Sequence, residues 1–145
     1  MTIRGLGHIN LRASAETIER LRGFYVDVIG LCEGARPMFR SGSRGYWLYA
    51  GDVAALHLTI AREGGASAQL PGVFNHMAFD CEDLEGTRAR LEAAEIEYQT
   101  DIVDERHQVQ LFLTDPAGIG VELTFTDVSL PEMVACTQAP TEHSV

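Results

Sequence analysis

The chain has 145 residues, with 11 basic and 21 acidic side chains and a formal net charge of −10. This length can bury a sizeable core in one domain, or in two small modules that share one. The acidic charge argues against nucleic acid and anionic membranes as partners, because both call for a basic patch. The sequence contains no apolar run of about 18 residues, so we expect no membrane-spanning helix.

The N-terminal sequence lacks the apolar core and cleavage site of a signal peptide, so we expect a cytoplasmic protein. The three cysteines are widely spaced and form neither zinc-type pairs nor a disulfide framework. They are Cys32, Cys81 and Cys136. We therefore expect reduced thiols.

The first half of the chain predicts a strand, a helix and three further strands. Ile9 and Leu11 alternate with polar residues, as in a strand over 3–12. Apolar residues at helical spacing predict a helix over 15–29, with Ser14 or Thr17 as N-cap and Gly30 just past its end. The remaining strands are expected at 31–39, 45–50 and 54–60, with turns at 40–44 and 51–52.

A small, polar and glycine-rich segment at 63–72 is typical of a linker. After it the same order of elements returns. A strand is expected at 73–80 and a helix from Asp83 or Thr87, followed by strands at 96–103, 109–114 and 121–125. Asp115-Pro-Ala-Gly predicts the turn before the last of these strands.

The two halves also match residue by residue. His57-Leu-Thr-Ile60 superposes without a gap on Glu122-Leu-Thr-Phe125, and the segment around His8 superposes on the segment around His76. An internal duplication is the economical explanation. We therefore predict an α+β fold in which two βαβββ modules in tandem form a curved, partly closed sheet with helices on its outer face. One domain spans 1–126, with modules at about 1–62 and 73–126, and 127–145 forms a surface tail or a short arm.

Four polar residues occupy matching strand positions: His8, His57, His76 and Glu122. A single strand histidine is ordinarily a hydrogen-bonded core or rim residue, and Glu122 alone is typical of a solvent-facing position. At duplicated positions, each flanked by apolar residues that point the other way, the four side chains should share one sheet face. Imidazole nitrogens and a carboxylate that converge there would hold a divalent metal such as Fe(II), Zn, Ni, Co or Mn.

The sequences around His8, Phe24, His76 and Asp115-Pro-Ala-Gly-Ile-Gly-Val-Glu122 resemble the vicinal oxygen chelate superfamily, over residues 4–126. That superfamily includes glyoxalase I, methylmalonyl-CoA epimerase, extradiol dioxygenases and the fosfomycin and bleomycin resistance proteins. The resemblance implies paired βαβββ modules and a homodimer whose sites combine modules from both chains. It also implies His8, His76 and Glu122 as metal ligands. His57 falls where glyoxalase I has glutamate and the epimerase has glutamine.

The resemblance implies chelation of a small substrate through adjacent oxygens. The expected activity is that of a lyase or isomerase that moves a proton next to a carbonyl, with Glu122 and His57 as catalytic residues. One alternative is an Fe(II) extradiol-type dioxygenase that cleaves a catechol-like substrate, with His57 as an acid or base beside the iron. The other is a resistance-type protein that binds a small molecule without turnover. Arg36, Arg40 and Arg44 are candidate contacts for an acidic group, although solvent-exposed arginines without such a role fit equally well.

Overall fold

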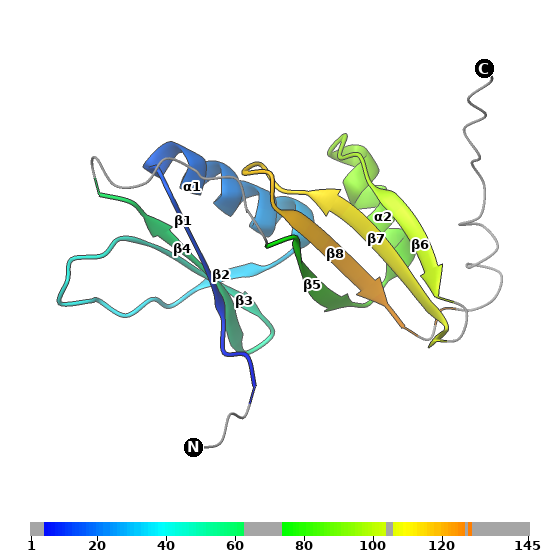
Figure 1. The fold of residues 1–145 in the computed structure, drawn as a ribbon, viewed down its shortest axis with the longest axis horizontal. Helices are drawn as coiled ribbons and strands as arrows, with labels where there is room; N and C mark the ends of the chain where they lie inside the picture. The colour runs from blue at the N-terminus through cyan, green and yellow to red at the C-terminus, as the bar shows by residue number, and fades with distance from the viewer. Residues whose placement is uncertain (1–4, 63–73, 104–105, 127, 129–145) are drawn as a thin grey trace. The chain divides into compact units, whose positions relative to one another are not determined.

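The computed structural model describes residues 5–62, 74–103, 106–126 and 128 (Figure 1). The chain divides into two compact units, Met1–Val73 with Asp115–Ile119 and Phe74–Thr114 with Gly120–Val145. Each unit has its own four-stranded mixed sheet and helix. The predicted α+β fold of two βαβββ modules is confirmed. The predicted linker at 63–72 lies outside the described residues, and so does the tail apart from Val128.

The first unit contains the strand β1, the helix α1, a π-helical turn η1 and three further strands. Their bounds are β1 Ile9–Ala13, α1 Ala15–Gly23, η1 Phe24–Ile29, β2 Cys32–Gly34, β3 Gly45–Ala50 and β4 Val53–Ile60. The strand order is β1-β4-β3-β2, in which β1 runs parallel to β4 and the other neighbours are antiparallel. The first strand begins later than predicted and the second is shorter. Pro37 cannot donate to a ladder, which helps to explain why β2 does not extend across the predicted range.

Helical structure in the first unit runs between the predicted caps. The Ser14 Oγ accepts a hydrogen bond from the Thr17 amide at 3.3 Å, which fixes the start. The last turn widens into η1, where the carbonyl of Tyr25 accepts the amides of both Gly30 and Leu31. Gly30 has a φ of 94°, a left-handed conformation that glycine adopts without strain. The helix therefore stops at the predicted residue.

The second unit repeats this order of elements. Its bounds are β5 His76–Cys81, α2 Leu84–Ala93, β6 Gln99–Val103, β7 Gln108–Thr114 and β8 Gly120–Phe125, in the strand order β5-β8-β7-β6. The Asp83 carboxylate accepts the amide of Gly86 at 3.0 Å, so the helix starts from Asp83 and not from Thr87. Among the described residues, no helix is long and apolar enough to cross a membrane.

Each sheet has an apolar face that builds a core. In the first unit α1 packs on β1 and β4, and Leu56 and Leu58 are almost fully buried. In the second unit Val121 and Leu123 on β8 and Leu91 on α2 are equally inaccessible. Because strand residues alternate between faces, this packing directs the intervening polar residues to the opposite face of each sheet.

The strand registers confirm the duplication. Trp47 pairs with His57 across β3 and β4, and Phe112 pairs with Glu122 across β7 and β8. On the parallel side, Asn10 faces His57 and Ala78 faces Glu122. Asn10 and Ala78 are therefore equivalent positions. His8 and His76, each two residues earlier, are equivalent too. The alignment of the two sequence halves predicted this correspondence.

Candidate metal centre

The second unit brings two of the predicted ligands together. The Nε2 atom of His76 lies 3.1 Å from Oε2 of Glu122. The first residue of β5 and the third of β8 approach in this way because the two strands run parallel with Ala78 opposite Glu122. The Glu122 side chain is 11% exposed and that of His76 is 40% exposed. An imidazole nitrogen and a nearly buried carboxylate oxygen thus lie side by side.

Three neighbouring side chains orient this pair. The Oε1 atom of Glu122 accepts hydrogen bonds from Gln110 Nε2 at 2.6 Å and from Thr124 Oγ1 at 2.9 Å. The Nδ1 atom of His76 lies 2.6 Å from Oδ1 of Asn75, so each ring nitrogen of His76 has an oxygen atom beside it. Such outer hydrogen bonds fix the direction of metal-ligating groups.

The first unit assembles the other two predicted ligands as a stack of rings. The rings of His8 and His57 are stacked with centroids 3.9 Å apart, and Trp47 stacks on the other side of His57 at 4.1 Å. The interplanar angles are 18° and 6°, so the three rings are nearly parallel. The His57 ring is therefore held between two flat side chains. This arrangement fixes its orientation from both sides.

The environment of His57 favours the neutral imidazole. Burial lowers its pKa below the usual value, and the nearby His8 lowers it further, while a hydrogen bond with the backbone of Ala54 acts in the opposite direction. The Nε2 atom is buried and has no hydrogen-bond partner among the described residues. A buried imidazole nitrogen without a partner costs free energy, and a bound group that used its lone pair would remove that cost.

The four predicted ligands thus occur as two pairs, one in each unit. Among the described residues, no group of three or more His, Cys, Asp or Glu side chains could hold a metal ion by itself. Each pair supplies two donors, and a protein metal site ordinarily uses three or four. The predicted four-ligand site would therefore need both pairs together.

Gln110 and Thr124 were not predicted from the sequence. Thr124 follows Glu122 by two residues, and this spacing on a strand places both side chains on one face. The sequence therefore carried a signal for Thr124. It carried none for Gln110, which lies on another strand. Gln110 becomes a neighbour of Glu122 only because β7 pairs with β8 so that Gln110 faces Thr124.

Asp115 serves the turn before β8, as the sequence predicts. Its Oδ1 accepts the amides of Ala117 and Ile119 at 2.8 and 3.0 Å, and its Oδ2 accepts the hydroxyl of Tyr25 at 2.8 Å. Asp115 is 4% exposed, and Tyr25 is completely buried. Burial and the adjacent carboxylate raise the pKa of Tyr25 far above its ordinary value. This is a structural contact within the first unit.

Comparison with known proteins identifies the family of this chain. A family model described as Glyoxalase/Bleomycin resistance protein/Dioxygenase superfamily matches residues 5–123. The chain is 30% identical over 134 residues to "Glyoxylase I 4" of Arabidopsis thaliana, covering 89% of this chain and 74% of that protein. The chain therefore belongs to the glyoxalase, bleomycin resistance protein and dioxygenase superfamily.

Solved structures share the fold at low sequence identity. A putative glyoxalase family protein from Bacillus anthracis matches with a TM-score of 0.67 and 21% identity, covering 88% of this chain and 98% of that one. A fosfomycin resistance protein from Listeria monocytogenes, complexed with Mn(II) and sulfate, matches with a TM-score of 0.59 and 15% identity. The match covers 92% of this chain and 99% of that chain.

Proposed function

We propose that this protein is a metal-dependent lyase or isomerase of the glyoxalase type. Its small substrate chelates the metal through adjacent oxygens and undergoes proton transfer next to a carbonyl. The observation that carries this proposal is the separation of 3.1 Å between His76 Nε2 and Glu122 Oε2. Two ligands of one ion, each about 2 Å from it, are typically about 3 Å apart.

We propose that His8, His57, His76 and Glu122 hold one divalent ion, which can be Ni, Co, Zn, Mn or Fe(II). Their nitrogen and oxygen donors suit these metals. The low pKa of His57 supports this assignment because an imidazole nitrogen must be deprotonated to bind a metal. The Listeria relative that was solved with Mn(II) supports a divalent metal in the superfamily.

Glu122 is the proposed base. A divalent ion at this site would supply Lewis-acid polarisation of a substrate carbonyl. Gln110 and Thr124 hold Oε1 of Glu122, so Oε2 would be both the ligand oxygen and the proton acceptor. It could take a proton from the carbon beside that carbonyl only after its bond to the metal loosens. His57 is the second proposed catalytic group, fixed in place by the two rings that flank it.

The first experiment measures metal content and proton exchange. We expect about one equivalent of Ni, Co, Zn or Mn by elemental analysis, and none in the His76→Ala or Glu122→Ala variants. A Glu82→Ala variant is the matched control, because this carboxylate is exposed and lies outside the pair. Exchange of the proton next to a carbonyl for deuterium, followed by NMR, tests the reaction class. Normal metal binding by both site variants would show that the ligands are assigned incorrectly.

We further propose a cytoplasmic homodimer in which each metal site takes one pair of ligands from each chain. Mixing a His8→Ala/His57→Ala chain with a His76→Ala/Glu122→Ala chain tests this arrangement. If sites are shared between chains, each mixed dimer regains one intact site and binds one metal ion. If both pairs come from the same chain, every site in the mixture lacks two ligands and no metal binds. Sedimentation as a monomer at micromolar concentration would also contradict the shared site.

A second candidate function is an Fe(II) extradiol-type dioxygenase. The enclosure of His57 between His8 and Trp47 favours it, because such a residue suits an acid or base beside the metal. In that case His8, His76 and Glu122 would be the three ligands. Fe(II) in the purified protein and ring cleavage of added catechols would favour this candidate over the first. A protein that takes up no metal would instead be a small-molecule binder.

A further inference from the structure

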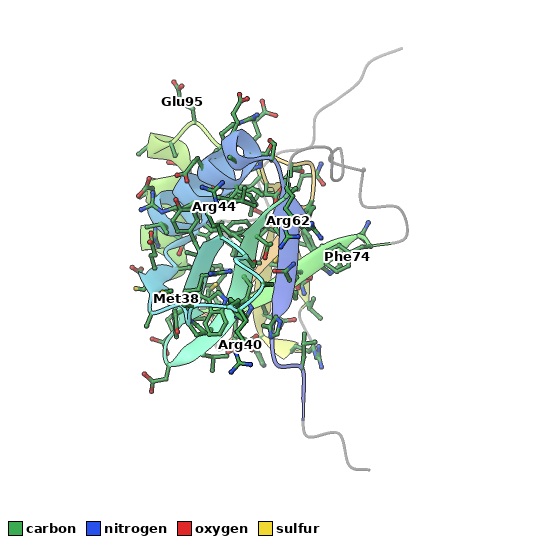
Figure 2. All side chains as sticks on the ribbon, turned by 90° about the vertical axis from the view of Figure 1, so that its left-hand side faces the viewer. Met38, Arg40, Arg44, Arg62, Phe74 and Glu95 are labelled. Carbon is green, nitrogen blue, oxygen red and sulfur yellow. The ribbon has the colours of Figure 1, made fainter. Side chains whose placement is uncertain are left out.

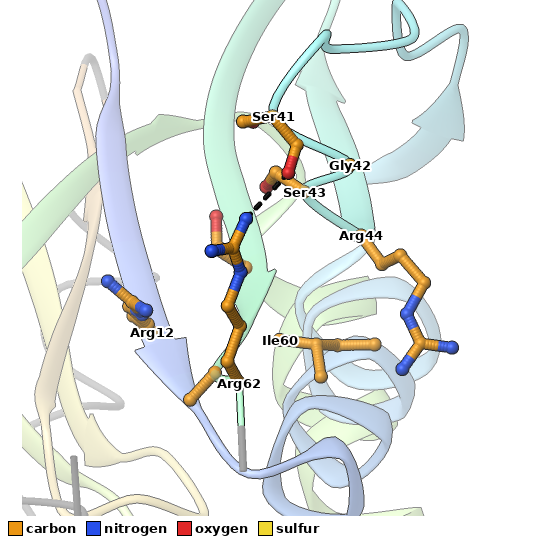
Figure 3. Close-up of a pocket in the computed structure, with 9 residues that line it drawn as sticks. Arg12, Ser41, Gly42, Ser43, Arg44, Ile60 and Arg62 are labelled. Atoms are coloured by element: carbon orange, nitrogen blue, oxygen red, sulfur yellow. Dashed lines mark hydrogen bonds between the residues drawn. The ribbon is translucent and has the colours of Figure 1, made fainter. Parts of the chain in front are cut away.

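A pocket of about 350 Å³ opens in the first unit where β1 and β4 end beside the 41–44 loop (Figure 3). Its wall combines three arginines with three hydroxyl groups, those of Arg12, Arg44, Arg62, Ser41, Ser43 and Thr59. No carboxylate is among the described residues that line it. The pocket therefore concentrates positive charge within a chain whose net charge is −10.

The arginines reach the pocket from separate segments. Arg12 lies on β1, Arg62 follows β4 and Arg44 precedes β3. Figure 3 shows Arg62 between Arg12 and Arg44. Arg62 Nη2 donates to the backbone carbonyl of Ser41 at 2.6 Å. This bond anchors the guanidinium and uses only one of its five N–H donors.

The Ser43 hydroxyl is positioned to donate a hydrogen bond into the pocket. Arg36 Nη2 donates to Ser43 Oγ at 3.1 Å, so the oxygen already accepts a hydrogen bond and its proton is available to the pocket. Thr59 differs because its hydroxyl donates to Asn10 Oδ1 at 2.8 Å. Guanidinium and hydroxyl donors therefore dominate the hydrogen-bonding capacity of the wall. That is the chemistry of an oxyanion site.

The charges of the pocket are not compensated by the described protein. Arg22 and Arg88 each form ion pairs with carboxylates. In the described ranges, no carboxylate lies within ion-pair distance of the three arginines that line the pocket. Like charges around one cavity repel one another, and an anion placed among them offsets that repulsion.

We propose that this pocket binds the carboxylate or phosphate group of a small soluble ligand. The planar guanidinium groups match the geometry of either oxyanion. The volume admits such a group together with several attached atoms. The pocket belongs to the first unit alone, so this proposal does not depend on the metal site or on the proposed reaction.

Titration of the full chain with inorganic phosphate, followed by NMR of backbone amides, tests the proposal. We expect saturable shifts at residues 41–44 and 59–62, and binding about 5- to 10-fold weaker in each of Arg12→Gln and Arg62→Gln, because each loses one charge-assisted contact. Arg40→Gln is the matched control. Arg40 belongs to the same region of chain but does not line the pocket, and Figure 2 shows it well apart from Arg44 and Arg62.

A parallel titration with citrate distinguishes the two ligand chemistries. The anion that binds more tightly, and that loses affinity in both pocket variants, identifies carboxylate or phosphate as the preferred group. Unchanged thermal unfolding of Arg12→Gln and Arg62→Gln would show that the loss is local. The proposal is overturned if neither anion shifts these amides, or if Arg40→Gln weakens binding as much as the pocket variants do.

Discussion

The Nε2 atom of His76 lies 3.1 Å from Oε2 of Glu122, and the other oxygen of that carboxylate is held by two further side chains. The pair joins the start of β5 to the middle of β8. Neighbouring parallel strands thus place an imidazole nitrogen beside a carboxylate oxygen on the polar face of the second sheet.

Gln110 should strengthen metal binding without contacting the metal. Replacing it with methionine removes the donor 2.6 Å from Glu122 Oε1 and allows the carboxylate to rotate. We expect metal affinity to fall about 10- to 100-fold, as is typical when an outer hydrogen bond to a ligand is lost, with the change measured by calorimetry. Gln99→Ala is the control, because Gln99 is exposed on β6 and has no described bond to Glu122. Equal losses in the two variants would rule out a positioning role.

Gly120 permits the close approach of β5 and β8. A Cβ atom added there would lie 2.7 Å from the carbonyl oxygen of Asn75 and 2.9 Å from Cβ of His76. Gly120→Ala should therefore cost about 1–3 kcal/mol in the free energy of unfolding and weaken metal binding, because the strands must separate. Urea unfolding and metal titration measure the two effects. Gly7→Ala, where an added Cβ meets nothing within 4 Å, should change neither.

The pKa of His57 should depend on His8. Burial is the larger cause of its low pKa and the neighbouring His8 is the next, so His8→Ala relieves both influences. We expect the His57 resonances in an NMR titration to report a higher pKa in His8→Ala than in the wild-type protein. An unchanged pKa would mean that the two rings do not stack in solution.

The lowered pKa of His57 also predicts a loss of stability in mild acid. The pKa of folded His57 lies below that of the unfolded chain, about 6.5, so the unfolded state binds more protons below that pH. The stabilisation is fully present above pH ~6.5 and is lost as the pH falls through the pKa of folded His57. Urea unfolding at several pH values should show a smaller acid loss in His57→Gln than in the wild-type protein. Equal slopes would contradict the prediction.

Tyr25 should stabilise the turn before β8. Tyr25→Phe removes a buried hydrogen bond to the Asp115 carboxylate. We expect the free energy of unfolding to fall by about 1.5–3 kcal/mol. Tyr98→Phe is the control, since its hydroxyl bond to Glu92 is long and exposed, and we expect a change within about 0.5 kcal/mol. The raised pKa of Tyr25 also gives the sign of the alkaline effect. Its stabilisation is present below pH ~10 and is lost as the pH rises further.

Most elements could be predicted because their signals are local. Ser14 and Asp83 begin helices and Gly30 ends one, each through contacts with residues at most five positions away. The β3 strand was predicted at its observed bounds because turn residues flank an aromatic run. The β2 strand was overextended because its length depends on pairing with β3, which extends only from Cys32 to Gly34. Pairing between strands is not visible in a local pattern.

The duplication in the sequence was enough to predict the two modules and the four candidate ligands. It could do so because alternation assigns each strand residue to a face and the repeat marks equivalent positions. The contacts that hold these residues in place could not be predicted in the same way, because they come from strand pairing. Gln110 reaches Glu122 through the pairing of β7 with β8, and Trp47 encloses His57 through the pairing of β3 with β4. Such contacts join residues ten or more positions apart, and the strand registers that create them depend on the packing of the whole sheet.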